Sequence, residues 1–374
     1  MNENIYKIDV LIVGGGPAGT SAALSLLTYS EHTVLLIEQS NLEQIRVGEH
    51  VSASLFDLTN YLKIEKNDFE AGSFLPAYEN VSFWGSDLPT SVNSIYMTEG
   101  STFQLDREKF DFKLIEEVVD RGGTFLPRTK CTKFVQLEDK TWKVIVKHPD
   151  KEAFSVHANY LVDATGRNAT ICRQVGASAK KMDALMGVGF FFDLGEGTNL
   201  RQEQLLETTE FGWWYVAQLP KNKVVATFFT DADIVSEQQL NQQANWNALL
   251  QQTKQVKYKL KGASSLSSKP WVRNAATQIS DSSTIDNFIA IGDAAAAFDP
   301  ISSMGIGFAM TSACHAAKFI QEQLSAKTNE ESLVYQKSLF KNFENYLSIR
   351  QQFYQKEKRW LSSPFWQRRN GANN

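Results

Sequence analysis

The stretch "VLIVGGGPAGTSAA", residues 10–23, joins an apolar strand, a glycine-rich turn and the start of a helix of small residues. Gly14, Gly16 and Gly19 have G-x-G-x-x-G spacing, which permits a tight turn, close approach of a phosphate to the main chain and close packing of helix on strand. A second apolar strand follows the helix at residues 33–38. These elements predict a β-α-β unit of a parallel sheet, with phosphate groups bound at the positive end of the helix dipole.

Two further features of the sequence predict that this motif binds a dinucleotide, and they favour a flavin dinucleotide. Glu38 ends the second strand, nineteen residues after the last glycine of the motif, where a carboxylate binds ribose hydroxyls of either FAD or NAD. In "IAIGDAA", residues 289–295, Asp293 follows a strand and precedes small residues, so its carboxylate can accept hydrogen bonds from the ribityl chain. Gly305 and Ile306 begin a predicted helix, whose backbone N–H groups can bind the flavin ring. Because the sequence shows no residue set typical of a nicotinamide dehydrogenase, we expect FAD.

Composition excludes several other classes of protein. The 374 residues are 43% hydrophobic and 21% charged with a net charge of −4, which is typical of a globular domain and argues against a nucleic-acid binder. The three cysteines are far apart and no metal-ligand spacing appears. Asp9 and the glycines interrupt the N-terminal apolar run, and no uncharged run is long enough to span a bilayer. We therefore expect a soluble, cytoplasmic protein without a membrane span.

The sequence pattern changes in the middle of the chain. Strand-like, aromatic segments such as "GVGFFFDL", "GWWYVAQLP" and "VVATFFTD" lie between residues 187 and 233, and they indicate an inserted antiparallel sheet. The predicted fold class is α/β (α+β): a Rossmann-like FAD-binding domain, an inserted antiparallel-sheet substrate domain and a C-terminal helical segment. The expected boundaries are residues 1–75, 100–180 and 275–325 for the FAD-binding domain, 76–99 and 181–274 for the substrate domain, and 326–374 for the helical region.

Four stretches together resemble a known family. "VLIVGGGPAGTSAA", "VGEHVSASL", "LVDATGR" and "AIGDAAAAFDPISSMGIGFA" run from residue 10 to residue 309 and are similar to FAD-dependent monooxygenases and halogenases of the para-hydroxybenzoate-hydroxylase-like fold. The resemblance implies an extended FAD, with Arg107 of "QLDREKFD" near the flavin and Arg46 and Glu49 in the loop that lines its ring. It also implies that O₂ reacts with reduced FAD to a C4a-hydroperoxide, which hydroxylates an aromatic ring. Either NAD(P)H or a separate reductase would supply the electrons.

A narrower resemblance concerns the substrate. "GWWYVAQLP" and "FDPISSMGI" resemble LodB/GoxB-type flavoproteins, which mature tryptophylquinone oxidases, and this implies a precursor quinone-cofactor oxidase as partner, hydroxylated on a tryptophan side chain. The similar halogenases use a lysine a few residues after "GE". Here Asp57 lies eight residues after Glu49, and the nearest following lysine is Lys63. Because a carboxylate cannot form a chloramine as an ammonium group can, the sequence does not favour halogenation.

The side chains expected around the flavin fall into three groups. Glu49, His50 or Asp299 can assist proton removal, although His50 also fits a loop histidine without a role. Asp299 and Pro300 are expected to shape the loop over the flavin. The predicted sets are Glu49, His50, Asp299 and Pro300 as catalytic residues; Gly14, Gly16, Pro17, Ala18, Gly19, Glu38, Gln39, Arg46, Arg107, Asp293, Gly305 and Ile306 for cofactor binding; and Trp213, Tyr215 and Phe298 for the substrate pocket.

Strand alternation puts Trp213 and Tyr215 on one face of the predicted sheet, where they either stack on the substrate or pack in the sheet. Three functions remain open from the sequence. The chain hydroxylates a peptidyl tryptophan; or it is a monooxygenase, reductase or halogenase of a small or carrier-bound aromatic or a lipid; or it is a non-catalytic flavin-binding maturation partner.

Overall fold

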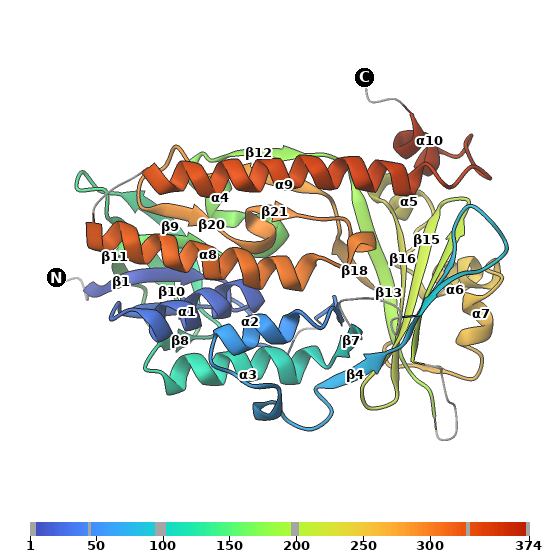
Figure 1. Ribbon diagram of the computed structural model, residues 1–374, viewed down its shortest axis with the longest axis horizontal. Coiled ribbons are helices and arrows are strands. Elements are labelled where there is room, and N and C mark those ends of the chain that lie inside the picture. Colours follow the sequence, from blue (N-terminus) through green and yellow to red (C-terminus); the bar gives the residue numbers. More distant parts are fainter. Residues whose placement is uncertain (1–4, 44–45, 94–101, 196–201, 327–329, 372–374) are drawn as a thin grey trace.

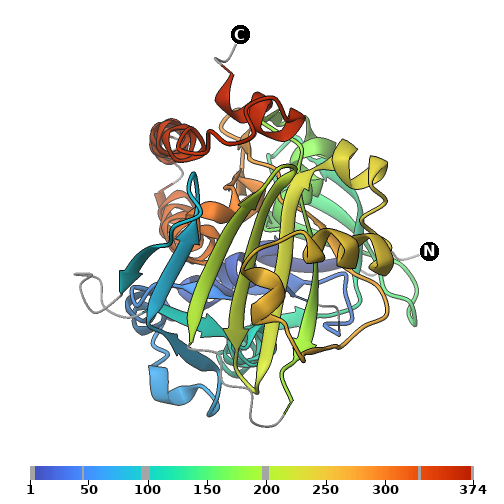
Figure 2. The ribbon, with the colours of Figure 1, turned by 90° about the vertical axis from the view of Figure 1, so that its right-hand side faces the viewer.

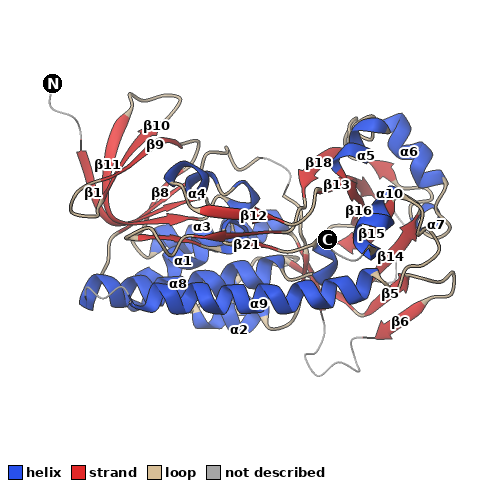
Figure 3. Cartoon of the chain, turned by 90° about the horizontal axis from the view of Figure 1, so that it is seen from above, coloured by secondary structure: helices blue, strands red, loops and turns tan. Residues whose placement is uncertain are grey.

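The computed structural model describes residues 5–43, 46–93, 102–195, 202–326 and 330–371. Parts of the expected segments 76–99 and 326–374 therefore lie outside the described residues. Within the described residues, two large sheets occupy opposite ends of the molecule (Figure 3). Among the described helices, none is long and apolar enough to cross a membrane.

The first sheet contains the predicted β-α-β unit (Figure 1). Its strand order is β8-β2-β1-β11-β10-β9, and β20 also pairs with β11. Five of these strands are parallel, while β10 and β9 run antiparallel to their neighbours. The bounds are β1 (Ile5–Val13), β2 (Val34–Ile37), β8 (Thr124–Leu126), β9 (Lys130–Gln136), β10 (Trp142–Lys147), β11 (Phe154–Asp163) and β20 (Phe288–Ala290).

Both faces of the first sheet are buried, as expected of parallel strands with near-continuous apolar sequence. Val10 and Ile12 face one core, which α1, α3 and α8 complete, whereas Leu11 faces a second core that includes Phe343 of α9. α9 runs along the first sheet and ends at the second (Figure 1). These helices are α1 (Pro17–Tyr29), α3 (Arg107–Asp120), α8 (Gly305–Ala326) and α9 (Glu330–Tyr354).

The second sheet has the order β17-β13-β16-β15-β14-β5-β6, and β18 also pairs with β13. Its pairs are antiparallel except β14 with β5, which is parallel. α6 and α7 lie in front of one face, and the first sheet lies behind the other (Figure 2). The bounds are β5 (Glu79–Phe83), β6 (Thr90–Asn93), β13 (Leu185–Asp193), β14 (Glu203–Thr209), β15 (Gly212–Leu219), β16 (Lys223–Asp231), β17 (Ser264–Ser265), β18 (Trp271–Asn274), α5 (Ala232–Glu237), α6 (Gln243–Gln251) and α7 (Val256–Lys259).

Two three-stranded sheets complete the described fold, with orders β3-β7-β4 and β12-β19-β21. The C-terminal helix α10 (Pro364–Asn370) lies against the second sheet, where the Trp366 indole donates to the Thr209 carbonyl at 2.9 Å. The remaining elements are β3 (His50–Val51), β4 (Phe74–Ala77), β7 (Thr102–Leu105), β12 (Ser178–Lys181), β19 (Gln278–Asp281), β21 (Ala296–Ala297), α2 (Leu55–Tyr61) and α4 (Thr170–Val175). The predicted fold class is confirmed.

Candidate functional site

The glycine turn between β1 and α1 holds two kinds of glycine. Gly14 has a φ of +118°, and a Cβ there would lie 2.1 Å from the Ala164 carbonyl oxygen; a Cβ at Gly19 would lie 1.8 Å from the oxygen of Gly14. These two positions need glycine for the fold itself. Gly16 differs, because its φ is −81° and a Cβ there would meet nothing within 4 Å. The turn therefore leaves open space at the N-terminus of α1.

The same open space recurs at the start of α8. Gly305 and Gly307 do not have a left-handed φ, and a Cβ added at either position would meet nothing within 4 Å. Among the glycines that the structure describes, only these two and Gly16 combine both properties. All three lie at helix N-termini, where backbone N–H groups and the helix dipole favour anions. The arrangement fits a cofactor that extends between the two helix starts.

Glu38 sits beside this turn and helps to form it. Its Oε2 accepts from the Gly15 N–H at 2.7 Å, and its Oε1 accepts from the Ser40 N–H at 2.7 Å. The carboxylate also lines the pocket described next, where each oxygen retains a further lone pair for a ribose hydroxyl. Glu38 can therefore stabilise the turn through the two backbone N–H groups and also bind a ribose hydroxyl.

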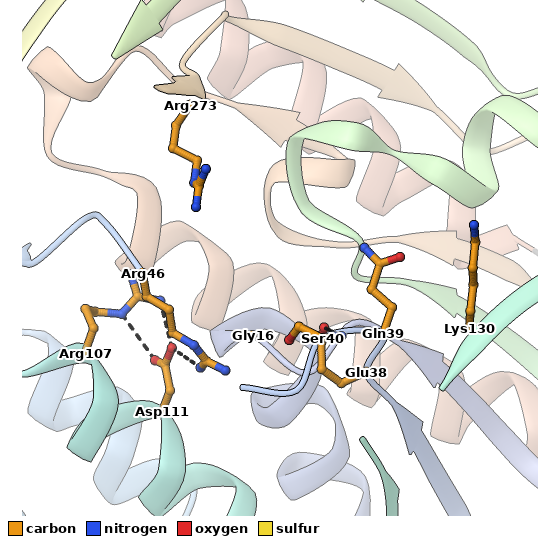
Figure 4. A pocket seen from close by; sticks show the side chains of 9 residues that line it. All are labelled: Gly16, Glu38, Gln39, Ser40, Arg46, Arg107, Asp111, Lys130 and Arg273. Atoms are coloured by element: carbon orange, nitrogen blue, oxygen red, sulfur yellow. Dashed lines mark hydrogen bonds and ion pairs between the residues drawn. The ribbon is translucent and has the colours of Figure 1, made fainter. Parts of the chain in front are cut away.

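A pocket of about 530 Å³ opens in front of the glycine turn (Figure 4). Four cationic side chains reach it, and Arg273 comes from β18 of the second sheet. Such a charge pattern suits a pyrophosphate. The lining residues are Gly16, Glu38, Gln39, Ser40, Arg46, Arg107, Asp111, Lys130 and Arg273.

Asp111 organises the cationic side of this pocket. Its carboxylate accepts from Arg46 Nη1 at 2.5 Å and from Arg107 Nη2 at 2.9 Å (Figure 4), and the side chain is only 1% exposed. Arg107 Nη1 also donates to the carbonyls of Val47 at 2.6 Å and Gly48 at 2.9 Å. Arg107 therefore fixes the loop that precedes Glu49. Sequence reasoning missed Asp111, although its i,i+4 spacing from Arg107 on α3 is a readable signal.

Asp293 lies in the 3₁₀ turn Gly292–Ala294, after β20. Its Oδ2 pairs with Arg167 Nε at 3.2 Å, while its Oδ1 is shielded from solvent and has no partner among the described residues. Arg167, from the "LVDATGR" stretch, also donates to the carbonyls of Ala276 and Phe298 at 2.8 and 2.7 Å. A buried oxygen without a partner is costly, so Asp293 fits a ligand with hydroxyl groups, as the ribityl chain has. Arg167 is a second residue that sequence reasoning missed.

Of the other cofactor-binding candidates, Pro17, Ala18 and Ile306 lie at the same two helix starts, and Gln39 lies after β2. Pro17 and Ala18 occupy the first turn of α1, and a Cβ added at Gly292 would lie 2.8 Å from the Cβ of Ala18. The side chain of Ile306 belongs to the first core, so only its backbone N–H, in the first turn of α8, remains as a candidate ligand group. Gln39 lines the pocket.

The loop after β21 contains Asp299, whose carboxylate is committed to the fold. Its Oδ1 accepts from the Ile301 N–H at 3.0 Å and its Oδ2 accepts from the Tyr354 hydroxyl at 2.8 Å. Burial, followed by the charge of Asp183, raises the pKa of Asp299. Pro300 begins the 3₁₀ turn Pro300–Ser302. The geometry supports the loop-shaping interpretation of Asp299 rather than proton transfer.

Two substrate-pocket candidates are placed differently from expectation. Phe298 packs against Phe308, Phe343 and Tyr346 in the core beneath α9, so it does not form a pocket wall. Trp213 is also buried; its ring stacks on another core aromatic and its indole donates to the Tyr354 hydroxyl at 3.0 Å. Both residues differ from the expected pocket positions because residues of the C-terminal part of the chain cover their rings.

Glu49 and His50 lie in a buried region between the FAD-binding part and the second sheet. Glu49 is 4% exposed, and burial raises the pKa of its carboxyl to about 7, against the opposing charge of Arg107. Burial lowers the pKa of His50 to about 4, so the ring is neutral at physiological pH. Neither nitrogen of His50 nor Oε1 of Glu49 has a hydrogen-bond partner among the described residues. A buried, half-ionised carboxyl is suited to accept a proton.

Comparison with known proteins gives the family. A family model described as "FAD binding domain" matches residues 7–337. The putative FAD-dependent oxidoreductase LodB of Marinomonas mediterranea is 42% identical over 361 residues, covering 96% of each chain. The chain belongs to the FAD-dependent monooxygenase/halogenase family. It is thus an FAD-dependent oxidoreductase, as the sequence predicted.

Solved structures share the fold of this FAD-dependent oxidoreductase. The flavin-dependent halogenase CmlS superposes with a TM-score of 0.85 at 24% identity, covering 98% of this chain and 68% of that one. The peptidyl tryptophan dihydroxylase QhpG, described as essential for tryptophylquinone cofactor biogenesis, superposes with a TM-score of 0.70 at 19% identity, covering 98% of this chain and 80% of that one. At these identities the likeness concerns the fold.

Proposed function

We propose that this flavoprotein hydroxylates the aromatic ring of a tryptophan side chain in a precursor oxidase, during the biogenesis of a tryptophylquinone cofactor. The observation that carries the proposal is the match to LodB over 96% of both chains, because the motifs of this chain resemble the flavoproteins that mature such oxidases. The fold shared with a peptidyl tryptophan dihydroxylase supports it.

The reaction consumes O₂ and two electrons: a ring C–H, O₂, two electrons and two protons give a ring C–OH and water. Bound FAD supplies the activation of O₂, and NAD(P)H or a separate reductase supplies the electrons. Gly16, Asp293 and the start of α8 would hold the cofactor. The protein must then orient the ring, exclude water and accept the proton that leaves the ring carbon.

We propose Glu49 as the residue that accepts that proton. Its loop is held by Arg107, and its carboxyl is buried with a raised pKa. Val47, two residues before Glu49, belongs with Tyr215 and Trp271 to one apolar cluster, and such a cluster would help to exclude water from the site. An apolar wall beside one titratable group suits an electron-rich aromatic substrate.

The positions equivalent to the halogenase lysine do not support halogenation. Asp57 lies on an exposed position of α2, and Lys63 lies beyond the C-terminal end of that helix with its side chain exposed. Both side chains are therefore exposed to solvent, whereas Glu49 is buried.

Co-expression with a tryptophylquinone oxidase precursor from the same organism tests the proposed function. We expect intact-mass and peptide mass spectrometry to show one or two added oxygen atoms on a single tryptophan. A precursor co-expressed without the flavoprotein is the control and should gain no oxygen. An unmodified precursor beside a flavin-loaded, reducible protein would refute the proposal.

The raised pKa of Glu49 predicts the pH dependence of oxygenation. Below pH 7 the carboxyl is protonated and cannot accept the ring proton, so the rate should rise about tenfold per pH unit toward pH 7 and level off above it. Glu49→Gln should lower the plateau by about 10²–10⁴-fold and flatten the profile. Glu108→Gln, at an exposed position on α3, is the matched control. An unchanged profile in Glu49→Gln would exclude Glu49 as the base.

A further inference from the structure

The loop between β21 and α8 carries Asp299, and its shape depends on contacts with other segments. Asp299 is 1% exposed, and its carboxylate accepts from the Ile301 N–H and from the Tyr354 hydroxyl. Ser303 has a φ of +53°, a left-handed backbone that a residue other than glycine keeps only where its surroundings hold it. Gly305 follows two residues later and begins α8. The contacts of this loop therefore decide where the first turn of α8 lies.

The Tyr354 hydroxyl bonds two groups whose roles are fixed by their chemistry. The indole N–H of Trp213 can only donate, and it does so at 3.0 Å, while Asp299 Oδ2 accepts from the Tyr354 hydroxyl at 2.8 Å. Each of the three residues is 1% exposed, so loss of one bond would leave a buried polar atom unpaired. A directed chain of hydrogen bonds therefore links β15 of the second sheet, through α9, to the loop before α8.

Tyr346, eight residues before Tyr354 on α9, holds the main chain of the same loop. The Asp299 N–H donates to the Tyr346 hydroxyl oxygen at 2.7 Å. The rings of Tyr346 and Phe298 pack edge to face, with their centroids 4.8 Å apart. Because Tyr346 is 6% exposed and Phe298 is 3% exposed, this contact is part of the core. Both the backbone and the carboxylate of Asp299 are thus bound by α9.

Arg350 lies midway between these two tyrosines and contacts both connections to the second sheet. Its Nη1 donates to Asp183 Oδ2 at 2.5 Å and to Thr277 Oγ1 at 2.7 Å. Asp183 lies between β12 and β13, and Thr277 lies between β18 and β19, where the chain passes between the small sheet β12-β19-β21 and the second sheet. Because Tyr346, Arg350 and Tyr354 are four residues apart, they follow one side of α9, which runs along the first sheet and ends at the second (Figure 1). We call these three residues the α9 row.

We propose that the residues of the α9 row are positioning residues for the flavin ring of the bound cofactor. The row fixes the loop 299–304 and with it the first turn of α8, where the open space at Gly305 fits the cofactor. The same row holds β15, through Trp213, and both connections to the second sheet. One helix therefore aligns the start of α8 with the second sheet. The proposal rests on the expected place of the ring at the start of α8 and not on the identity of the substrate.

Removal of a single hydroxyl group tests the α9 row with little change in packing. Tyr346→Phe and Tyr354→Phe should each weaken FAD binding by about tenfold, because one bond that holds Asp299 is lost in each variant. Both should also shift the reduction potential of the bound flavin and its visible circular dichroism, which report on the protein groups around the ring. Redox titration, circular dichroism and titration of flavin-free protein with FAD measure these effects.

Two comparisons separate positioning from folding. Gln336→Leu is the matched control on α9, since the Gln336 amide donates to the Ser280 carbonyl at 2.9 Å, on β19 and not in the loop. It should lower the melting temperature without changing the flavin spectrum or reduction potential. Arg350→Met should change both flavin properties, and Arg350→Lys should restore part of the wild-type values because its ammonium group can still pair with Asp183.

A double-mutant cycle tests whether Tyr354 acts through Asp299. Asp299→Asn offers one acceptor oxygen to two donors, the Ile301 N–H and the Tyr354 hydroxyl, so it should weaken FAD binding as Tyr354→Phe does. When the two changes are combined, the loss of affinity should stay within about threefold of the larger single loss. Losses that multiply would mean that Tyr354 acts independently of the loop, and they would overturn the positioning role.

The flavin measurements also keep this proposal separate from the proposed function. An unchanged flavin potential, spectrum and affinity in both tyrosine variants would overturn the positioning role, and so would changes of the same size in Gln336→Leu. All of these measurements use the flavoprotein alone, without a precursor oxidase. A precursor that gains no oxygen would therefore refute the proposed function and leave the positioning role standing.

Discussion

Gly16→Val is expected to give a folded protein that purifies without flavin. A Cβ at Gly16 would meet no protein atom within 4 Å and the φ there is −81°, so we expect the fold to accommodate a side chain. The same side chain projects into the pocket where the cofactor pyrophosphate is expected, and overpacking there should weaken FAD binding by about a hundredfold. Flavin absorbance per chain and a melting temperature compared with that of flavin-free wild type measure the two effects separately.

Gly14→Val is the informative contrast. Its Cβ would lie 2.1 Å from the Ala164 carbonyl oxygen and its φ of +118° disfavours any branched residue, so this variant should lose stability as well as flavin. A yellow Gly16→Val protein with wild-type flavin content would show that the cofactor does not approach the glycine turn.

Asp111→Asn is expected to lower the free energy of unfolding by about 3 kcal/mol, because removal of one partner leaves buried arginines uncompensated. The carboxylate pairs with Arg46 and Arg107, whose side chains are 19% and 12% exposed. Urea denaturation of flavin-free protein measures the loss. Because Arg107 also fixes the loop before Glu49, flavin affinity and the oxygenation rate should fall as well.

Asp150→Asn provides the matched comparison. Asp150 pairs with Arg128 at 2.6 Å, but both side chains are more than half exposed, and such surface pairs contribute below about 1 kcal/mol. Equal losses in the two variants would mean that the Asp111 cluster is as solvated as a surface ion pair, and that it does not organise the pocket.

The first sheet and the two ends of the cofactor site were predictable because their signals are local. The glycine spacing around Gly14, the apolar strands and the short "GDAA" run each specify a backbone shape within a few residues, and the FAD-binding family confirms the reading of the cofactor. Strand alternation also places Trp213 and Tyr215 on one face of β15, in clusters distinct from that of Trp214.

The remaining parts depend on contacts between distant segments. Arg167 pairs with Asp293, and Tyr215 of β15 donates to Gln104 of β7 in another sheet. No spacing in the sequence links these pairs. Phe298 was misplaced for the same reason, since its burial results from α9, whose position on the core cannot be read from the loop itself.

The strands of the first sheet come from distant parts of the sequence, and this has a consequence for the newly synthesised chain. β1 and α1 leave the ribosome first, but β20 and the start of α8 follow only after all strands of the second sheet. At about 5–20 residues per second, roughly 15–60 s separate the two halves of the predicted flavin site. During that interval the nascent chain already carries the glycine turn and the charged residues of the pocket, but it lacks Asp293 and the start of α8. A chain stalled before Asp293 therefore lacks the end of the predicted site that faces the ribityl chain and the flavin ring.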